Sequence, residues 1–181
     1  MRRFLLLLMV FPLYGYAGSA VLKQSLWAKA SQLAGVHPNT LYGIALQETG
    51  MRWHDRTFRP WPWTIYVNQG GAGIKSGPYR YPTKEAAVKA LTVMLDQGVT
   101  NIDVGLMQVN IRWNGHRVRD KKLLIDPSVN IMVAAGILKD VHVGNSLRQA
   151  VARYHSFNAG RGAAYSTKVK RYETLLDEKF E

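Results

Sequence analysis

The sequence has no cysteine among its 181 residues, so it can form neither a disulfide framework nor a thiolate metal site. The histidines do not show a metal-ligand spacing such as H-E-x-x-H; they are His37, His54, His116, His142 and His155. A P-loop and a dinucleotide-binding fingerprint are also absent from the sequence. We therefore expect neither a metal ion nor another cofactor.

Acidic residues are scarce. There are 12 Asp and Glu against 24 Lys and Arg, which gives a formal net charge of +12 and favours an anionic partner. Hydrophobic residues make up 47% of the sequence and charged residues 20%, which is ordinary for a folded domain and argues against disorder. The length predicts one domain with a core of its own.

An apolar run is found at the start of the chain. Arg2 and Arg3 precede the apolar residues Phe4–Leu13, and small residues follow, as in a secretory signal peptide. The run is shorter than the roughly 20 residues that a membrane span needs. We expect cleavage after Ala17, with Ala20 as the alternative site and an uncleaved membrane anchor as the competing interpretation.

This boundary divides the chain into a signal peptide, residues 1–17, and one domain, residues 18–181. It predicts an exported, periplasmic protein that contacts the membrane only through its signal peptide. For such a protein, cell-wall polymers are better anionic partners than nucleic acid. No recognised nucleic-acid-binding motif is present either.

Helical spacing of apolar residues and capping signals predict a mainly α protein. Helices are expected over residues 20–33, 39–49, 84–97, 127–143, 147–155 and 163–179. Residues 52–81 are rich in Trp, Gly and Pro, and we expect a loop there with one hairpin around Gly70-Gly71. The periodicity does not assign a type to the short apolar stretch 104–109.

Glu48 is the candidate catalytic residue. Leu41, Ile44 and Ala45 share a helical face with Glu48, so its carboxyl lies on the apolar side at the end of the helix. Partial burial without a cation raises the pKa of a carboxyl. A carboxyl that stays protonated near neutral pH can act as a general acid. The alternative is a partly exposed glutamate bonded to backbone amides.

Four segments carry recognisable motifs: Ala45–Gly50 (ALQETG), Gly105–Asn110 (GLMQVN), Asp126–Leu138 and Ala150–Tyr154. In this order they resemble the motifs of the SLT-type lytic transglycosylases of the lysozyme-like superfamily. Small members of this family accompany conjugation, secretion or pilus machines. The resemblance implies a lysozyme-like (goose-type or SLT) α-domain.

The resemblance also implies an activity: cleavage of the β-1,4 bond between N-acetylmuramic acid and N-acetylglucosamine in peptidoglycan, with formation of 1,6-anhydro ends. Glu48 would act first as acid and then as base, without a cofactor. By the same resemblance, Gln108 and its neighbours line the groove floor, and the Tyr154 hydroxyl lies near Glu48. The predicted substrate-binding residues are Thr49, Asp103, Met107, Gln108, Asn110 and Tyr154.

Three departures from the family pattern are visible. Thr49 replaces the usual serine but keeps its hydroxyl. Residues 52–103, approximately, form an insertion longer than the family's usual loop. The tyrosine motif fits either Tyr154-His155-Ser156, which the preceding helix favours, or Phe157–Gly160, which lacks the tyrosine.

Asp103 is the candidate second carboxylate. If it positioned a water molecule opposite Glu48, the chain would be a goose-type-like lysozyme, which is a hydrolase. A structural or substrate-contacting role for Asp103 is the competing interpretation. A third possibility is a catalytically silent wall-binding module that kept the fold.

Two further groups have open roles. Trp61 and Trp63 could stack on sugars or simply pack the insertion onto the domain. A basic cluster could contact carboxylates of the peptide stems or form a solvated face; its members are Arg112, Arg117, Arg119, Lys121 and Lys122.

Overall fold

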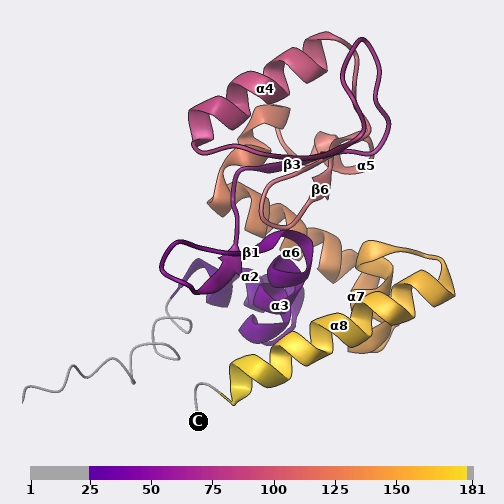
Figure 1. Ribbon diagram of the computed structural model, residues 1–181. Helices are drawn as coiled ribbons and strands as arrows, with labels where there is room; N and C mark the ends of the chain where they lie inside the picture. Colours follow the sequence, from indigo (N-terminus) through magenta and orange to yellow (C-terminus); the bar gives the residue numbers. More distant parts are fainter. Residues whose placement is uncertain (1–24, 179–181) are drawn as a thin grey trace, which may run out of the picture.

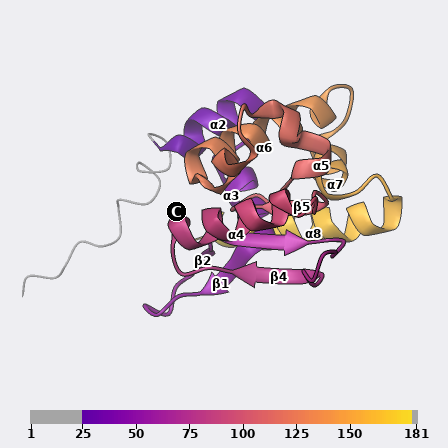
Figure 2. The same cartoon turned by 90° about the horizontal axis from the view of Figure 1, so that it is seen from above.

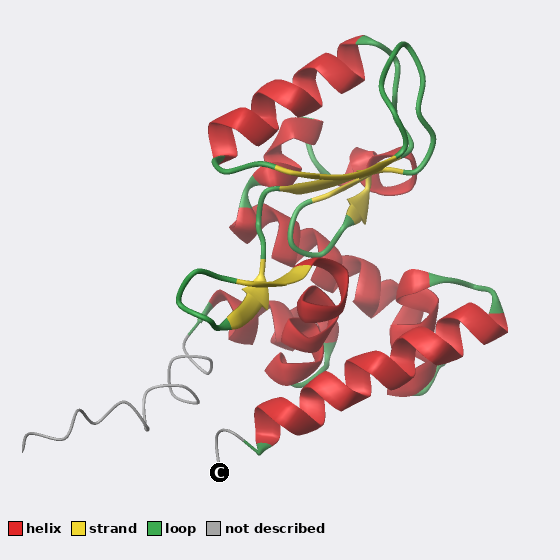
Figure 3. Ribbon diagram, viewed as in Figure 1, coloured by secondary structure: helices red, strands yellow, loops and turns green. Residues whose placement is uncertain are grey.

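A computed structural model describes residues 25–178 of the chain (Figure 1). The predicted signal peptide, residues 1–17, lies outside the described residues, and so does residue 179 at the end of the last expected helix. The described part is mainly helical with small antiparallel sheets, so the expected mainly α class is confirmed (Figure 3). No helix within residues 25–178 combines the length and the apolar character needed to cross a membrane.

The helical part of the described chain is built around α6, which packs against α2 and α7, while α3 packs against α8. The α-helices are α2 (Leu26–Ala34), α3 (Pro38–Thr49), α4 (Lys84–Asp96), α5 (Ile111–Asn114), α6 (Pro127–His142), α7 (Leu147–His155) and α8 (Ala159–Asp177). Two short 3₁₀ helices are η1 (Gly115–Arg117) and η2 (Lys121–Ile125). These short elements and α5 were not expected from the sequence.

Side-chain caps set the starts of most of the predicted helices. The Thr83 side chain accepts a hydrogen bond from the Ala86 amide at the start of α4, and Asp126 caps α6. Ser146 and Gln149 form the expected capping box at the start of α7. Each cap satisfies amides that the first turn of a helix leaves without a partner.

The start of α8 was predicted wrongly. The helix begins at Ala159, four residues before the expected Ala163, because the side chain of Asn158 accepts a hydrogen bond from the Arg161 amide at 3.0 Å. Asn158 belongs to the alternative tyrosine-motif segment, residues 157–160. Its role in the structure is therefore that of a helix cap.

The insertion is more regular than the sequence predicted. Antiparallel strands form a two-stranded sheet and a four-stranded sheet in the order β4-β3-β5-β6. In Figure 2, β4 is seen beside a strand that runs in the opposite direction. The strands are β1 (Gly50–Arg52), β2 (Phe58–Pro60), β3 (Thr64–Val67), β4 (Gly77–Arg80), β5 (Ile102–Val104) and β6 (Val109–Asn110). The hairpin around Gly70-Gly71 is confirmed, since it joins β3 to β4. The other pairings were missed, because strands of two to four residues are too short to show a period of two.

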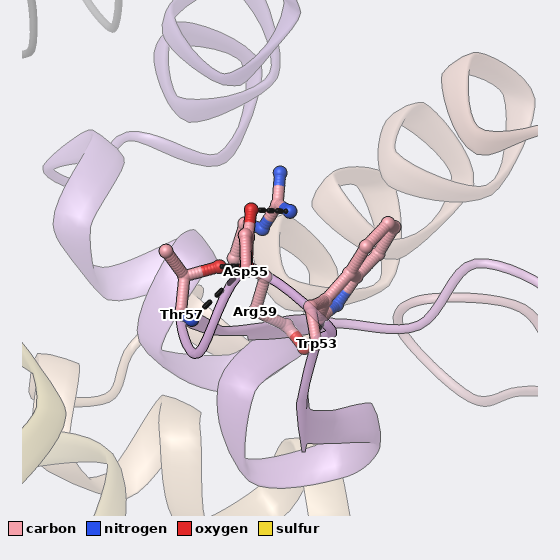
Figure 4. A network of polar contacts seen from close by, with 4 residues as sticks. All are labelled: Trp53, Asp55, Thr57 and Arg59. Atoms are coloured by element: carbon pink, nitrogen blue, oxygen red, sulfur yellow. Dashed lines mark hydrogen bonds and ion pairs between the residues drawn. The ribbon is translucent and has the colours of Figure 1, made fainter.

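The hairpin of β1 and β2 is held by a local polar network (Figure 4). Asp55 accepts hydrogen bonds from the Thr57 amide at 3.0 Å and hydroxyl at 2.6 Å, and forms an ion pair with Arg59. The Arg59 guanidinium lies 4.1 Å from the centre of the Trp53 ring. This cation–π contact joins the loop of the hairpin to its return strand.

Trp61 and Trp63 pack within the insertion. Their ring centres are 5.5 Å apart, and the Trp61 ring lies 4.8 Å from that of Trp53. The indole nitrogen of Trp61 donates to the Tyr81 carbonyl at 2.8 Å. These contacts agree with the packing interpretation of the two tryptophans.

The helical body and the insertion share one hydrophobic core. Its fully buried side chains include Leu41 and Leu138 from helices of the body, and Ile65 and Leu91 from the sheet and α4 of the insertion. Because apolar area is removed from water across this junction, the insertion is held firmly against the body. Side chains from both parts can therefore build one site.

Candidate active site

The candidate site is a groove of about 770 Å³ whose lining includes Glu48. Part of the lining comes from the insertion and the segments that follow it; these residues include Asn68, Asn101, Asp103, Gln108, Asn110 and Trp113. Another part comes from α7 and the start of α8; these residues are Arg153, Tyr154, His155, Ser156, Phe157 and Arg161. Four of the predicted substrate-binding residues thus meet Glu48 in one groove, and two do not.

Glu48 lies in the last turn of α3, and its carboxyl is largely enclosed. Burial raises the pKa of this carboxyl to about 7; a hydrogen bond from Tyr165 acts in the opposite direction, and the charge of Asp103 raises the pKa further. The Tyr165 hydroxyl donates to Glu48 Oε1 at 2.5 Å. Near neutral pH, Glu48 therefore exists in both protonation states, as a group that first gives and then takes a proton must.

Tyr165 is a site residue that the sequence reasoning missed. It is buried on α8, and burial together with the charge of Glu48 keeps the pKa of its hydroxyl well above the usual value. It therefore stays protonated and can donate to the carboxylate form of Glu48. Tyr165 lies one helical turn before Val169, which is also buried on α8, so helical spacing could have placed it on the buried face but not beside Glu48.

Tyr154 lines the groove together with Glu48, but its hydroxyl does not donate to that carboxyl. Burial and the charges of Glu48 and Asp103 raise the pKa of Tyr154, so both carboxylates act electrostatically on its hydroxyl. That hydroxyl nevertheless donates to the Met107 carbonyl at 2.8 Å, and the bond to Glu48 comes from Tyr165. Tyr154 thus fixes the wall of the groove beside the carboxyl.

The turn between β5 and β6 carries the second motif. Gly105 has a φ of 80°, and a Cβ atom there would lie 2.5 Å from the side-chain nitrogen of Asn130. Only glycine fits such a close approach with a positive φ. Buried Asn130 donates to the Val104 and Leu124 carbonyls and accepts from the Met107 amide, so it holds both ends of this turn.

Gln108 closes the same turn with a φ of 48°. Its side-chain nitrogen donates to the Gly105 carbonyl at 2.9 Å and to the Thr64 carbonyl at 3.3 Å. No hydrogen bond from the described residues reaches its side-chain oxygen. Gln108 can therefore offer an acceptor to a ligand in the groove.

Thr49 and Met107 are fully buried, and neither lines the groove. The structure therefore corrects the prediction that these two side chains contact the substrate. The Thr49 hydroxyl donates to the Leu106 carbonyl at 2.9 Å and ties the end of α3 to the turn. The Met107 carbonyl is the acceptor for Tyr154.

Asp103 is engaged on both of its carboxylate oxygens. Oδ1 accepts from the Asn110 side chain and Oδ2 from the Asn68 side chain, each at 2.7 Å. Burial raises the pKa of Asp103, and these two hydrogen bonds oppose that shift. The Asn110 side chain also donates to Asn101 Oδ1 at 3.1 Å and caps α5, so its polar groups are used within the protein.

Two exposed aromatic rings line the groove, and the sequence analysis did not single out either of them. Trp113 is 71% exposed and Phe157 is 79% exposed, and both line the groove. Flat apolar faces of this kind suit a sugar ring. By contrast, Trp61 and Trp63, which had been considered for stacking, do not line it.

The predicted basic cluster contributes one residue to the groove. Arg117 lines it and is paired with Asp140 at 2.6 Å. Lys122 forms an ion pair with Asp120 at 3.5 Å, outside the groove. The cluster therefore agrees best with a solvated face, and the other cations of the groove are Arg153 and Arg161 on α7 and α8.

Within residues 25–178, no group of three or more acidic or histidine side chains is arranged to hold a metal ion. Comparison of the chain with protein-family models, with curated proteins and with solved structures finds no match. The described part is thus a mainly α protein with a groove of about 770 Å³, whose lining includes a carboxyl with a pKa of about 7.

Proposed function

We propose that this chain is a lytic transglycosylase with a lysozyme-like fold that cleaves the glycan strands of peptidoglycan. The observation that carries the proposal is the enclosed carboxyl of Glu48, whose pKa of about 7 combines with a hydrogen bond from Tyr165 in a groove rich in amides and aromatic rings. Amides, hydroxyls and flat rings are suited to an uncharged sugar.

The chemistry needs one protein carboxyl. Protonated Glu48 gives its proton to the glycosidic oxygen as the bond from C1 of N-acetylmuramic acid to that oxygen breaks. The C6 hydroxyl oxygen of the same sugar then bonds to C1, and its proton passes to the Glu48 carboxylate. The acetamido group of the substrate assists, no water is consumed, and Glu48 regains its starting state.

The state of Asp103 supports ring closure over hydrolysis. Both of its oxygens already accept hydrogen bonds from asparagine side chains, which leaves it poorly placed to take a proton from water. A hydrolase of the goose-type lysozyme kind is the second candidate, since Asp103 shares the groove and its charge acts on Glu48.

The setting of this activity is part of the proposal. The signal-peptide pattern at residues 1–17 and the net charge of +12 support export to the periplasm and attraction to the anionic wall. There the enzyme would open the wall locally for a secretion, conjugation or pilus machine.

The test is mass spectrometry of the soluble products that purified peptidoglycan releases with the wild type and with Glu48→Gln. We expect anhydro-muropeptides from the wild type only. Reducing-end products from the wild type would mean hydrolysis. No product from either protein, with a control enzyme active on the same substrate, would favour a silent wall-binding module.

A further inference from the structure

Two guanidinium groups at the groove have no acidic partner among the described residues. They belong to Arg153 on α7 and Arg161 in the first turn of α8, and both line the groove. Both residues are exposed. An unpaired arginine in a recognition groove presents a planar fork that matches a carboxylate.

Among the described residues, none of the carboxylates of the groove forms an ion pair with either arginine. Glu48 accepts from Tyr165, and Asp140 is paired with Arg117. Asp103 accepts from two asparagines. The α7–α8 end of the groove is therefore a local excess of positive charge.

The charge of Arg161 affects the neighbouring side chain of His155. Burial lowers the pKa of His155, which lines the same end, and the charge of Arg161 lowers it further, while Asp103 acts in the opposite sense. His155 stacks on Tyr165 with ring centres 4.5 Å apart. Phe157 lies between the two arginines in sequence and is 79% exposed, which adds an apolar face to this end of the groove.

We infer that Arg153 and Arg161 form an anion subsite that binds a carboxylate carried by the glycan. This inference rests on the proposed function. The ligand chemistry is a carboxylate attached to a sugar, and it has two sources in peptidoglycan, the lactyl group of muramic acid and the carboxylates of the peptide stem. A glycan without carboxylates gains nothing from the subsite.

The test measures the affinity of Glu48→Gln protein, which cannot turn over substrate, for three ligands. They are peptide-bearing glycan strands, strands stripped of peptides that keep their lactyl carboxylates, and neutral oligomers of N-acetylglucosamine. The double substitution Arg153→Gln and Arg161→Gln is compared with Arg148→Gln, since Arg148 is an exposed arginine on the same helix that does not line the groove.

We expect the double variant to bind carboxylate-bearing strands roughly threefold to tenfold more weakly, and the neutral oligomers unchanged. Weakening with peptide-bearing strands alone identifies the peptide stem, and weakening with both strands identifies the lactyl group. Equal weakening for neutral oligomers, equal weakening by Arg148→Gln, or no change would overturn the inference. Failure of the proposed function is distinct, because the wild type would then release no anhydro products.

Discussion

Two partly buried carboxyls share the groove, and their surroundings differ. Glu48 at the end of α3 has one hydrogen-bond donor, Tyr165, and its pKa is raised to about 7. Asp103 on β5 has two amide donors that oppose the effect of its burial. Burial raises the pKa of both carboxyls, and the comparison teaches that the number of hydrogen-bond donors sets how strongly that effect is opposed, with one donor at Glu48 and two at Asp103.

Substitutions of the two carboxyls should differ most in their effect on enzymatic activity. Glu48→Gln removes the exchangeable proton, and we expect the rate of anhydro-product release to fall by about a thousandfold or more. Asp103→Asn keeps the shape but turns one acceptor into a donor that faces an asparagine. We expect a loss of about tenfold, from misplaced groove residues, with products still of the anhydro type.

Chromatography of the products from both variants checks this difference. Circular dichroism at the assay temperature controls for folding. If Asp103→Asn lost as much activity as Glu48→Gln, the roles assigned to the two carboxyls would be wrong.

Stability should depend on pH through Glu48. Its folded pKa is raised above the unfolded value, so the folded state binds more protons and loses stability as pH rises from about 4.5 to about 7. Glu48→Gln removes this dependence. We expect the variant to gain about 3 kcal/mol over the wild type between pH 4.5 and pH 8.

Urea unfolding at a series of pH values measures the gap in free energy of unfolding between the wild type and Glu48→Gln. Asp103→Asn serves as a comparison, because burial also raises the pKa of Asp103 but two hydrogen bonds oppose that rise. A gap that stayed constant with pH would mean that the Glu48 carboxyl is as well solvated when folded as when unfolded.

The turn between β5 and β6, which accepts a hydrogen bond from Thr49 at the end of α3, should depend on Asn130. Asn130→Ala leaves two carbonyls and one amide in the core without their partner, which should lower the free energy of unfolding by about 2–3 kcal/mol. Asn145→Ala is the matched control. Asn145 bonds two carbonyls at the solvent-accessible end of α6, so its loss should cost less than about 1 kcal/mol.

Thermal unfolding of both asparagine variants, with chemical denaturation at one pH, measures the two costs. Equal costs would mean that Asn130 contributes no more than a surface cap. The Asn130 variant should also lose activity, because the turn that it holds carries Gln108.

Much of the helical structure could be predicted because residues close together in the sequence determine where a helix starts. The capping box of Ser146 and Gln149 and the start at Asp126-Pro127 each involve only neighbouring residues, so both can be recognised in the sequence. The sheet of the insertion depends on pairing between distant short strands, such as β3 with β5. No local pattern encodes such a pairing.

The site shows the same division. Glu48 could be found from its place on the apolar face of one helix. Its hydrogen-bond partner Tyr165 lies 117 positions away, and only the packing of α3 on α8 joins them. Tyr154 and Tyr165 are equivalent as residue types, so the sequence could not decide which hydroxyl reaches the carboxyl.

These two tyrosines give the finest test of the comparison. Tyr165→Phe removes the one donor that stabilises the charged form of Glu48, so its pKa should rise further. The alkaline limb of the rate profile should then move upward by about one pH unit, as expected for the loss of one hydrogen bond to a charged group. Tyr154→Phe removes a bond to the Met107 carbonyl instead, so it should lower stability by about 1 kcal/mol and leave that limb in place. Initial rates of product release between pH 5 and pH 9 separate the two variants. A shift in Tyr154→Phe with none in Tyr165→Phe would return the tyrosine role to the residue that the family resemblance implied.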